Sequence, residues 1–153
     1  KNARVVPVIT LVLYFGIDRR WKYPRKLKDS LKIPDGLDDY VNDFKINVFE
    51  IAWLSDEEIE NFTGDIKIVA KFFANRRKYK NYIPDDKQEI EHVDEILKLL
   101  SAMTGDNRYE KILALPEKGQ VSNMCEVAER LTNIGKAEGI IEGRQEGIIE
   151  GQA

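Results

Sequence analysis

Cationic and aromatic side chains alternate in a stretch near the start of the chain. Cations neutralise the backbone phosphates of nucleic acid, and aromatic rings stack on exposed bases. We therefore predict that this stretch contacts DNA through six residues: Arg19, Arg20, Trp21, Lys22, Arg25 and Lys26. Tyr23 is a further candidate for stacking. The alternative interpretation is a solvated loop whose aromatic rings are buried beneath it.

Two sets of acidic and basic residues match the string pattern of a metal-dependent nuclease. In such a site carboxylates hold Mg²⁺ and a lysine stabilises charge near the attacking water. One match is PD at residues 34–35 with DIK at 65–67, and the other is DFK at 43–45. The chemistry requires carboxylates on adjacent strands, whereas Asp65 is predicted to lie in the first turn of a helix. We therefore interpret both matches as accidental in a chain with 33% charged residues.

Few other residues have the type and spacing of a reaction centre. His92 is the only histidine, and we interpret it as a solvated residue of a helix rather than as part of a nucleophile pair. The sequence contains neither a glycine-rich phosphate loop nor an HExxH motif. Cys125 is the only cysteine, which excludes an intrachain disulfide and indicates a reducing, cytoplasmic compartment.

The charge of the chain is distributed unevenly. The net charge of -3 argues against binding of nucleic acid through overall basicity. Residues 1–31 nevertheless carry eight Lys or Arg against two Asp, whereas residues 35–65 carry ten Asp or Glu against one Lys. The sequence therefore predicts two surfaces of opposite sign, and the candidate DNA contact lies on the basic one.

An apolar segment, VVPVITLVLYFG at residues 5–16, precedes the basic stretch. Its β-branched residues favour a strand that is buried on both faces. The segment superficially matches a signal-peptide core, but it is too short to span a bilayer and no cleavage site follows, so we predict no membrane partner. A second strand is predicted at residues 45–51. Because no methionine precedes Met103, we expect that further residues precede Lys1.

The rest of the sequence has the pattern of helices. Ser55 and Glu58 form a capping-box pair at the start of the first helix. A longer helix is predicted to begin at Asp86 and to stop at Gly105. Further helices are predicted from residue 66 to the basic residues 76–78, at residues 109–115, and from Asn123 onward.

The end of the chain repeats glycine at every fourth position from Gly135 to Gly151. Each glycine disfavours a helix interior by about 1 kcal/mol relative to alanine. Residues 135–153 are therefore expected to be either a frayed tail or a helix that forms only against a partner, where a glycine face lets two backbones approach closely. The heptad spacing of apolar residues favours a homo-oligomer. Its predicted interface consists of Val127, Leu131, Ile134 and Ile141.

Several motifs together resemble one known group of sequences. They are RVVPVITLVLYFG at residues 4–16, W-x-x-P-R-x-L at 21–27, Y-V-x-D-F-K-I-N-V-F-E-I at 40–51, F-x-x-D-I-K-I-V-A-K-F at 62–72, and the closing M-C-E-V-A-E-R-L run with its G-x-x-E-G repeats. The chain resembles, over essentially its whole length, the C-terminal part of the Rpn-type recombination-promoting nucleases, also called PD-(D/E)XK nuclease family transposases.

This resemblance implies an α-rich α/β fold. The terminal strands of a restriction-endonuclease-like core are expected at residues 1–54, a helical region at 55–121, and a C-terminal helix with a coiled-coil-like glycine-repeat tail at 122–153. The resemblance further implies a Mg²⁺-dependent DNA endonuclease that acts in DNA mobility or recombination. The catalytic residues of that family would precede Lys1, so no catalytic or metal-binding residue and no bound cofactor is expected in this chain, which by itself is expected to be inactive.

Two other kinds of function remain open from the sequence. The chain can be a stand-alone oligomerisation or regulatory module that modulates a full-length relative without cutting DNA. Alternatively, it can be a helical adaptor unrelated to DNA, in which the acidic run at residues 35–65 is the protein-binding face.

Overall fold

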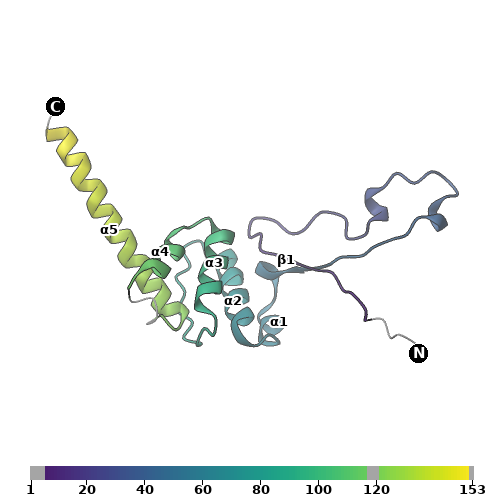
Figure 1. The fold of residues 1–153 in the computed structure, drawn as a ribbon, viewed down its shortest axis with the longest axis horizontal. Coiled ribbons are helices and arrows are strands. Elements are labelled where there is room, and N and C mark those ends of the chain that lie inside the picture. Colours follow the sequence, from purple (N-terminus) through teal and green to yellow (C-terminus); the bar gives the residue numbers. More distant parts are fainter. Residues whose placement is uncertain (1–5, 117–120, 152–153) are drawn as a thin grey trace.

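The computed structural model describes residues 6–116 and 121–151 (Figure 1). Within this part of the chain, two short strands precede a set of helices. The strands are β1 (Leu11–Tyr14) and β2 (Asn47–Glu50), and the α-helices are α1 (Asp56–Glu60), α2 (Gly64–Lys78), α3 (Val93–Thr104), α4 (Arg108–Ala114) and α5 (Met124–Gly151). Three 3-10 turns are present as well: η1 (Lys28–Ser30), η2 (Asp38–Tyr40) and η3 (Ile51–Trp53). The chain is therefore α-rich, with a small parallel sheet.

The two strands pair in parallel, with Leu11 opposite Asn47 and Tyr14 opposite Glu50. Parallel pairing requires the chain to cross back between the strands. Here the crossover is a long loop that contains η1 and η2 and extends away from the helices (Figure 1). The basic stretch of the sequence lies in the first part of this loop.

The prediction that the first strand is buried on both faces was wrong for the described residues. Leu11 and Leu13 are 59% and 48% exposed, and Phe49 on β2 is 41% exposed. The apolar sequence does form a strand, but in a two-stranded sheet it has a single neighbouring strand, and no described helix covers the face that carries Leu11 and Leu13. The apolar, β-branched sequence thus predicted the strand correctly but not its burial.

The hydrophobic core is built around α2. Its residues Ile68, Val69 and Phe73 are each at most 2% exposed, which shows that the helix is covered on several sides. The core continues into η3, α3, α4 and the first turns of α5 through the following buried residues: Ile51, Ala52, Leu97, Leu100, Ile112, Met124 and Val127. Phe15, which directly follows β1, joins this core, because its ring centroid lies 5.0 Å from that of Phe73. The sheet and the helices therefore share one apolar centre.

Three sequence signals for helix ends are confirmed. The backbone N–H of Glu58 donates to Ser55 Oγ at 3.1 Å, and the N–H of Ser55 donates to Glu58 Oε2 at 2.7 Å, which completes the capping box. Gly105 ends α3 with a φ of 71°, a left-handed conformation that glycine adopts without steric cost. Asn123 Oδ1 accepts the N–H of Glu126 at 3.0 Å at the start of α5.

The helix predicted from Asp86 was wrong at its beginning, because α3 starts only at Val93. The preceding residues are held in a non-helical conformation by hydrogen bonds to distant parts of the chain. The N–H of Ile90 donates to the carbonyl of Ser122 at 2.7 Å, and the N–H of Cys125 donates to the carbonyl of Asp86 at 3.2 Å. These tertiary bonds replace the first turns that the periodicity suggested.

The glycine-repeat segment forms a helix, which corrects the expectation that its glycines prevent one without a partner. α5 runs continuously for 28 residues and projects from the rest of the structure (Figure 1). Nucleation is the unfavourable step of helix formation, and the first turns of α5 are already fixed in the core. An ion pair between Lys111 on α4 and Glu138 secures the helix further along. The glycine segment therefore extends an existing helix.

Asp65, in the first turn of α2, connects that helix to the start of α3. Its two carboxylate oxygens accept the backbone N–H groups of Glu91 and His92, both at 2.8 Å, and Oδ2 lies 3.0 Å from Nδ1 of His92. Burial by itself would raise the pKa of Asp65, but the hydrogen bonds from these two N–H groups outweigh it and hold the pKa below its ordinary value.

We predict that Asp65→Asn destabilises the protein at neutral pH and has a smaller effect in acid. A carboxyl group whose pKa is lower in the folded than in the unfolded state stabilises the fold above the unfolded pKa of about 3.9, and this contribution is lost as the pH falls through the folded pKa. Urea unfolding of both proteins at pH 6 and near pH 3 measures the effect. A difference in unfolding free energy between the two proteins that is equal at both pH values would contradict this role.

Candidate nucleic-acid interface

An aromatic cluster fixes the start of the basic loop. The Tyr14 hydroxyl donates to the carbonyl of Arg19 at 2.9 Å. The ring of Trp21 makes edge contacts with Tyr14 and Tyr23, at centroid distances of 5.6 and 5.4 Å, and its indole N–H donates to the carbonyl of Tyr23 at 2.8 Å. Trp21 is therefore half-buried and committed to its neighbours, whereas Tyr23 is 56% exposed. Of the two rings, Tyr23 is the one that an external base can reach.

Glu50, at the end of β2, holds the loop against the sheet. Its Oε1 accepts the backbone N–H of Trp21 at 2.7 Å and lies 3.6 Å from Nε of Arg20. Its Oε2 lies 3.5 Å from a terminal guanidinium nitrogen of Arg25. The Glu50 side chain is 15% exposed, so this carboxylate faces the loop rather than the solvent. Two of the predicted DNA-contacting residues, Arg20 and Arg25, thus share one internal counter-charge.

Trp53 joins the same loop to the end of α2. The guanidinium carbon of Arg20 lies 5.2 Å from the Trp53 ring centroid, and that of Arg77 lies 4.5 Å from it, both within the range of a cation–π contact. The indole N–H of Trp53 donates to the carbonyl of Gly16, and Nε of Arg77 donates to the carbonyl of Ala52. The basic end of α2 therefore takes part in positioning the loop, in addition to the favourable helix-dipole interaction expected there.

Three predicted DNA-contacting residues, Arg19, Lys22 and Lys26, differ from the two arginines beside Glu50. All three are exposed, and their side chains make no hydrogen bond or ion pair with any residue that the structure describes. The backbone around Lys26 is nevertheless fixed, because Lys26 forms an antiparallel bridge with Lys45. The loop consequently presents three unpaired positive charges on an anchored backbone, next to the exposed ring of Tyr23.

Glu50, Trp53 and Arg77 are the residues of this site that sequence reasoning missed. An acidic residue at the end of an otherwise apolar strand was the available signal for Glu50, since a half-buried carboxylate requires partners. Trp53 lies well beyond the basic stretch in the sequence, and Arg77 was explained by its place at a helix end alone. Neither residue carries a pattern that points to the loop.

The strings that match a metal-dependent nuclease do not form a metal site in the structure. Both carboxylate oxygens of Asp65 accept hydrogen bonds from backbone N–H groups just before α3. Asp43 Oδ1 accepts the N–H of Lys28 at 3.1 Å. Lys67 pairs with Glu60 at 2.7 Å. Across residues 6–116 and 121–151, no group of three or more His, Cys, Asp or Glu residues is arranged to hold a metal ion. The donors present in this part of the chain therefore do not fit Mg²⁺.

The predicted oligomer interface is divided between the core and the surface. Val127 is 0% exposed and packs within the core of its own chain, which corrects its assignment to an interface with a second copy. Leu131 and Ile134 are half-buried against the same core. Ile141 is 57% exposed, as is most of the helix around it. The heptad positions are thus buried at the start of α5 and exposed to solvent further along the helix.

The described structure is that of an α-rich α/β protein with a small parallel sheet and an anchored cationic loop. Residues 1–109 match the family described as "Putative transposase, YhgA-like", and the chain belongs to that family. The match includes both strands, the basic loop and α1 to α3. No curated protein and no solved structure matches the chain. None of the described helices is long and apolar enough to cross a membrane.

We predict that Glu50→Gln loosens the basic loop without unfolding the helical core. A hydrogen bond to a charged group contributes about 1.5 to 3 kcal/mol, so the Trp21 amide should lose roughly tenfold or more of its protection against hydrogen exchange. Hydrogen exchange read by mass spectrometry on peptides covering residues 17–27 measures this loss. The control is Glu57→Gln, at an exposed position of α1. Equal exchange in both variants would show that Glu50 does not anchor the loop.

Proposed function

We propose that this chain contacts DNA through the loop at residues 19–26 and serves a transposase-family endonuclease in DNA mobility or recombination. The observation that carries the proposal is the set of three exposed, unpaired cations beside Tyr23 on a loop that Glu50 holds in place. Cations fixed on a rigid backbone neutralise phosphates without a large cost of ordering, and the phenol ring suits an unstacked base. Membership of the YhgA-like family supports DNA as the partner.

The hydrolytic chemistry belongs to the same proposal. We propose that β1 and β2 are the terminal strands of a restriction-endonuclease-like core and that the parent activity is Mg²⁺-dependent phosphodiester hydrolysis. The exposed leucines of β1 support this arrangement, because an apolar strand face is normally covered by further layers. When bound, Mg²⁺ would polarise the phosphate and activate a water. The described residues contain no set of donors arranged to hold Mg²⁺. Their part in this proposed function is to contact DNA.

We predict that reversing the three unpaired charges, in the combined variant Arg19→Glu, Lys22→Glu and Lys26→Glu, weakens DNA binding and its dependence on salt. Each phosphate contact contributes about 0.7 to 0.9 to the slope of log K against log salt concentration, so the loss of three contacts lowers the slope by roughly 2 to 3. Fluorescence anisotropy with a labelled duplex and a labelled single strand, over a series of salt concentrations, measures both quantities.

A matched variant controls for net charge. Lys87, Lys98 and Lys136 are exposed cations outside the loop, and their combined replacement by glutamate changes the net charge by the same amount. This control should retain the wild-type slope. If both triple variants lose the same affinity and slope, the binding reflects overall charge, and the loop is not the contact.

We also propose that a second copy of the chain packs against the exposed end of α5. At about 100° per residue, Ile134, Ile141 and Ile148 lie on one stripe, which continues the core-facing stripe of the helix. Ile141 and Ile148 are 57% and 60% exposed. The glycines at 139, 143 and 147 lie on the opposite side of the helix, and a Cβ atom at any of them would have no atom from elsewhere in the described chain within 4 Å. The isoleucine stripe is therefore the better candidate for the contact than the glycine face, and its heptad spacing suits an identical helix.

We predict that truncation after Glu138 lowers the mass measured by light scattering to that of a monomer. This truncation removes the exposed stripe and keeps the ion pair between Lys111 and Glu138 that secures the helix. As a control, Gly143→Ala with Gly147→Ala should retain the oligomer, because these positions face away from the stripe and alanine favours the helix by about 1 kcal/mol per site. A full-length chain that is already monomeric, or a truncated chain with unchanged mass, would contradict the proposal.

A further inference from the structure

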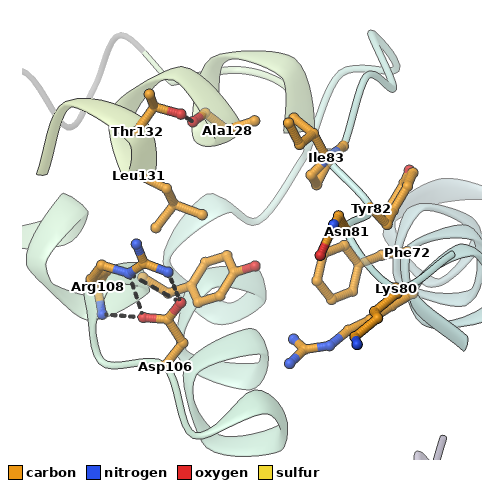
Figure 2. Close-up of a pocket in the computed structure, with 13 residues that line it drawn as sticks. Phe72, Lys80, Asn81, Tyr82, Ile83, Asp106, Arg108, Ala128, Leu131 and Thr132 are labelled. Atoms are coloured by element: carbon orange, nitrogen blue, oxygen red, sulfur yellow. Dashed lines mark hydrogen bonds and ion pairs between the residues drawn. The ribbon is translucent and has the colours of Figure 1, made fainter. Parts of the chain in front are cut away.

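A pocket of about 310 Å³ lies on the helical side of the molecule, away from the basic loop. It is enclosed by the end of α2, the segment that follows α2, the start of α4, and the early turns of α5 (Figure 2). Its volume is at the lower end of the range of small-molecule sites. The pocket can therefore hold a ligand of the size of a mononucleotide.

The walls of this pocket carry an excess of positive charge. Three cations line it, Arg76, Lys80 and Arg108, against one acid, Asp106. Arg108 is neutralised by Asp106, because its Nε lies 2.9 and 3.2 Å from the two carboxylate oxygens and a terminal nitrogen lies 2.7 Å from Oδ2 (Figure 2). Arg76 and Lys80 make no hydrogen bond or ion pair with any described residue. No described carboxylate is hydrogen-bonded or ion-paired to either cation, and the electrostatic attraction that reaches them from the pocket acid is that between Arg76 and Asp106.

The acid in the pocket offsets these charges only in part, because it attracts Arg76 but is hydrogen-bonded to Arg108. Asp106 is committed to Arg108, and its hydrogen bonds from the Arg108 side chain hold its pKa below the ordinary value despite its partial burial. The Asp106 carboxylate and the Arg108 guanidinium therefore remain a neutral pair over the physiological pH range. An anionic group of a ligand would complete the charge balance of Arg76 and Lys80.

Tyr109 adds a hydrogen-bond donor to the pocket. Its side chain is 4% exposed, yet its hydroxyl makes no hydrogen bond with a described residue. Burial raises the pKa of Tyr109 to about 12, so the hydroxyl stays protonated and remains a donor. The ring is buried, but the hydroxyl oxygen itself stays accessible to solvent in the pocket. A ligand oxygen that enters the pocket can accept this hydrogen bond in place of solvent.

Aromatic and apolar side chains form the rest of the pocket. The Phe72 ring lies 6.4 Å from Tyr109 and 6.1 Å from Tyr82, measured between centroids, so three rings border one space. Leu131 and Ala128 of α5 close it on another side (Figure 2). Such walls favour a flat, weakly polar ring, which stacks against aromatic faces or edges. The pocket combines this surface with the cations Arg76 and Lys80.

We propose that this pocket binds a phosphomonoester that carries a planar ring, as in a nucleoside monophosphate. Arg76 and Lys80 contact the phosphate, the Tyr109 hydroxyl donates to a ligand oxygen, and the ring lies among Phe72, Tyr82 and Leu131. The ligand is either a free nucleotide or the phosphorylated terminal nucleotide of a DNA strand, since both present the same chemistry. The inference does not depend on the basic loop, because the pocket shares no residue with it.

The test is calorimetric titration of the full chain with thymidine 5′-monophosphate, thymidine and inorganic phosphate. The nucleotide is expected to bind at least tenfold more tightly than either of the other two. Arg76→Gln with Lys80→Gln should weaken nucleotide binding tenfold or more, and Tyr109→Phe, which keeps the ring, should weaken it several-fold. Lys87→Gln with Lys98→Gln removes the same charge outside this pocket and should leave the affinity unchanged.

Two oligonucleotides, identical except for a 5′-phosphate or a 5′-hydroxyl, separate the two sources of the ligand. They are titrated into the chain that carries Arg19→Glu, Lys22→Glu and Lys26→Glu, so that binding through the basic loop does not contribute. Preference for the phosphorylated strand identifies a DNA end, and binding of the mononucleotide alone identifies a free nucleotide. Absence of binding by all phosphate-containing probes, or equal losses in the pocket and control variants of unchanged circular dichroism, would overturn the proposal.

Discussion

Burial of α2 is the constraint on which the rest of the described structure depends. The helix is apolar on most of its circumference, since Ile68, Val69, Phe72 and Phe73 are all buried, and such a helix is stable only when other elements cover it. η3, α3, α4 and the beginning of α5 provide that cover. Phe15 brings the end of β1 onto the same helix, and Arg77 at the helix end reaches Trp53 and the carbonyl of Ala52. The geometry of the exposed loop is thus set from the core outward.

Two groups of cations on this protein differ in their surroundings. Arg20, Arg25, Arg77 and Arg108 are arginines held by a carboxylate, a carbonyl or an indole ring, and they position the chain around them. The second group consists of cations on the basic loop and in the pocket beside α5 whose side chains make no hydrogen bond or ion pair with a described residue. Because the internal pairs are already satisfied, an incoming phosphate competes with solvent at the second group and not with an existing ion pair. This division is the basis on which we propose two local anion sites on an acidic protein.

Local signals in the sequence were sufficient for the helix ends and insufficient for contacts between distant segments. The capping box at Ser55, the left-handed Gly105 and the start of α5 at Asn123 each depend on residues within one turn, and all three were predicted. The segment before α3 was misassigned because its backbone N–H groups donate to the Asp65 carboxylate and to the carbonyl of Ser122, both far away in the sequence. Glu50 was not recognised as the anchor of the loop for the same reason, since Trp21 lies 29 positions away. The heptad at Val127 has the same apolar pattern whether it faces the core or a second copy, so only the packing of α5 could distinguish the two.

The parallel pairing of β1 with β2 has a consequence for the order in which the chain folds. Asn47 donates to the carbonyl of Thr10, 37 positions earlier, so the sheet closes a long loop and gives up the conformational entropy of the segment between. Contacts between neighbouring helices, such as α1 with α2 and α3 with α4, are closer in sequence and can form first, since pairing of distant segments is slow. The sheet, and with it the cationic loop, would then be the last unit to form and the first to open by local unfolding. Contact with a polyanion would shift that local equilibrium towards the closed state, so binding at the loop would be coupled to the completion of folding.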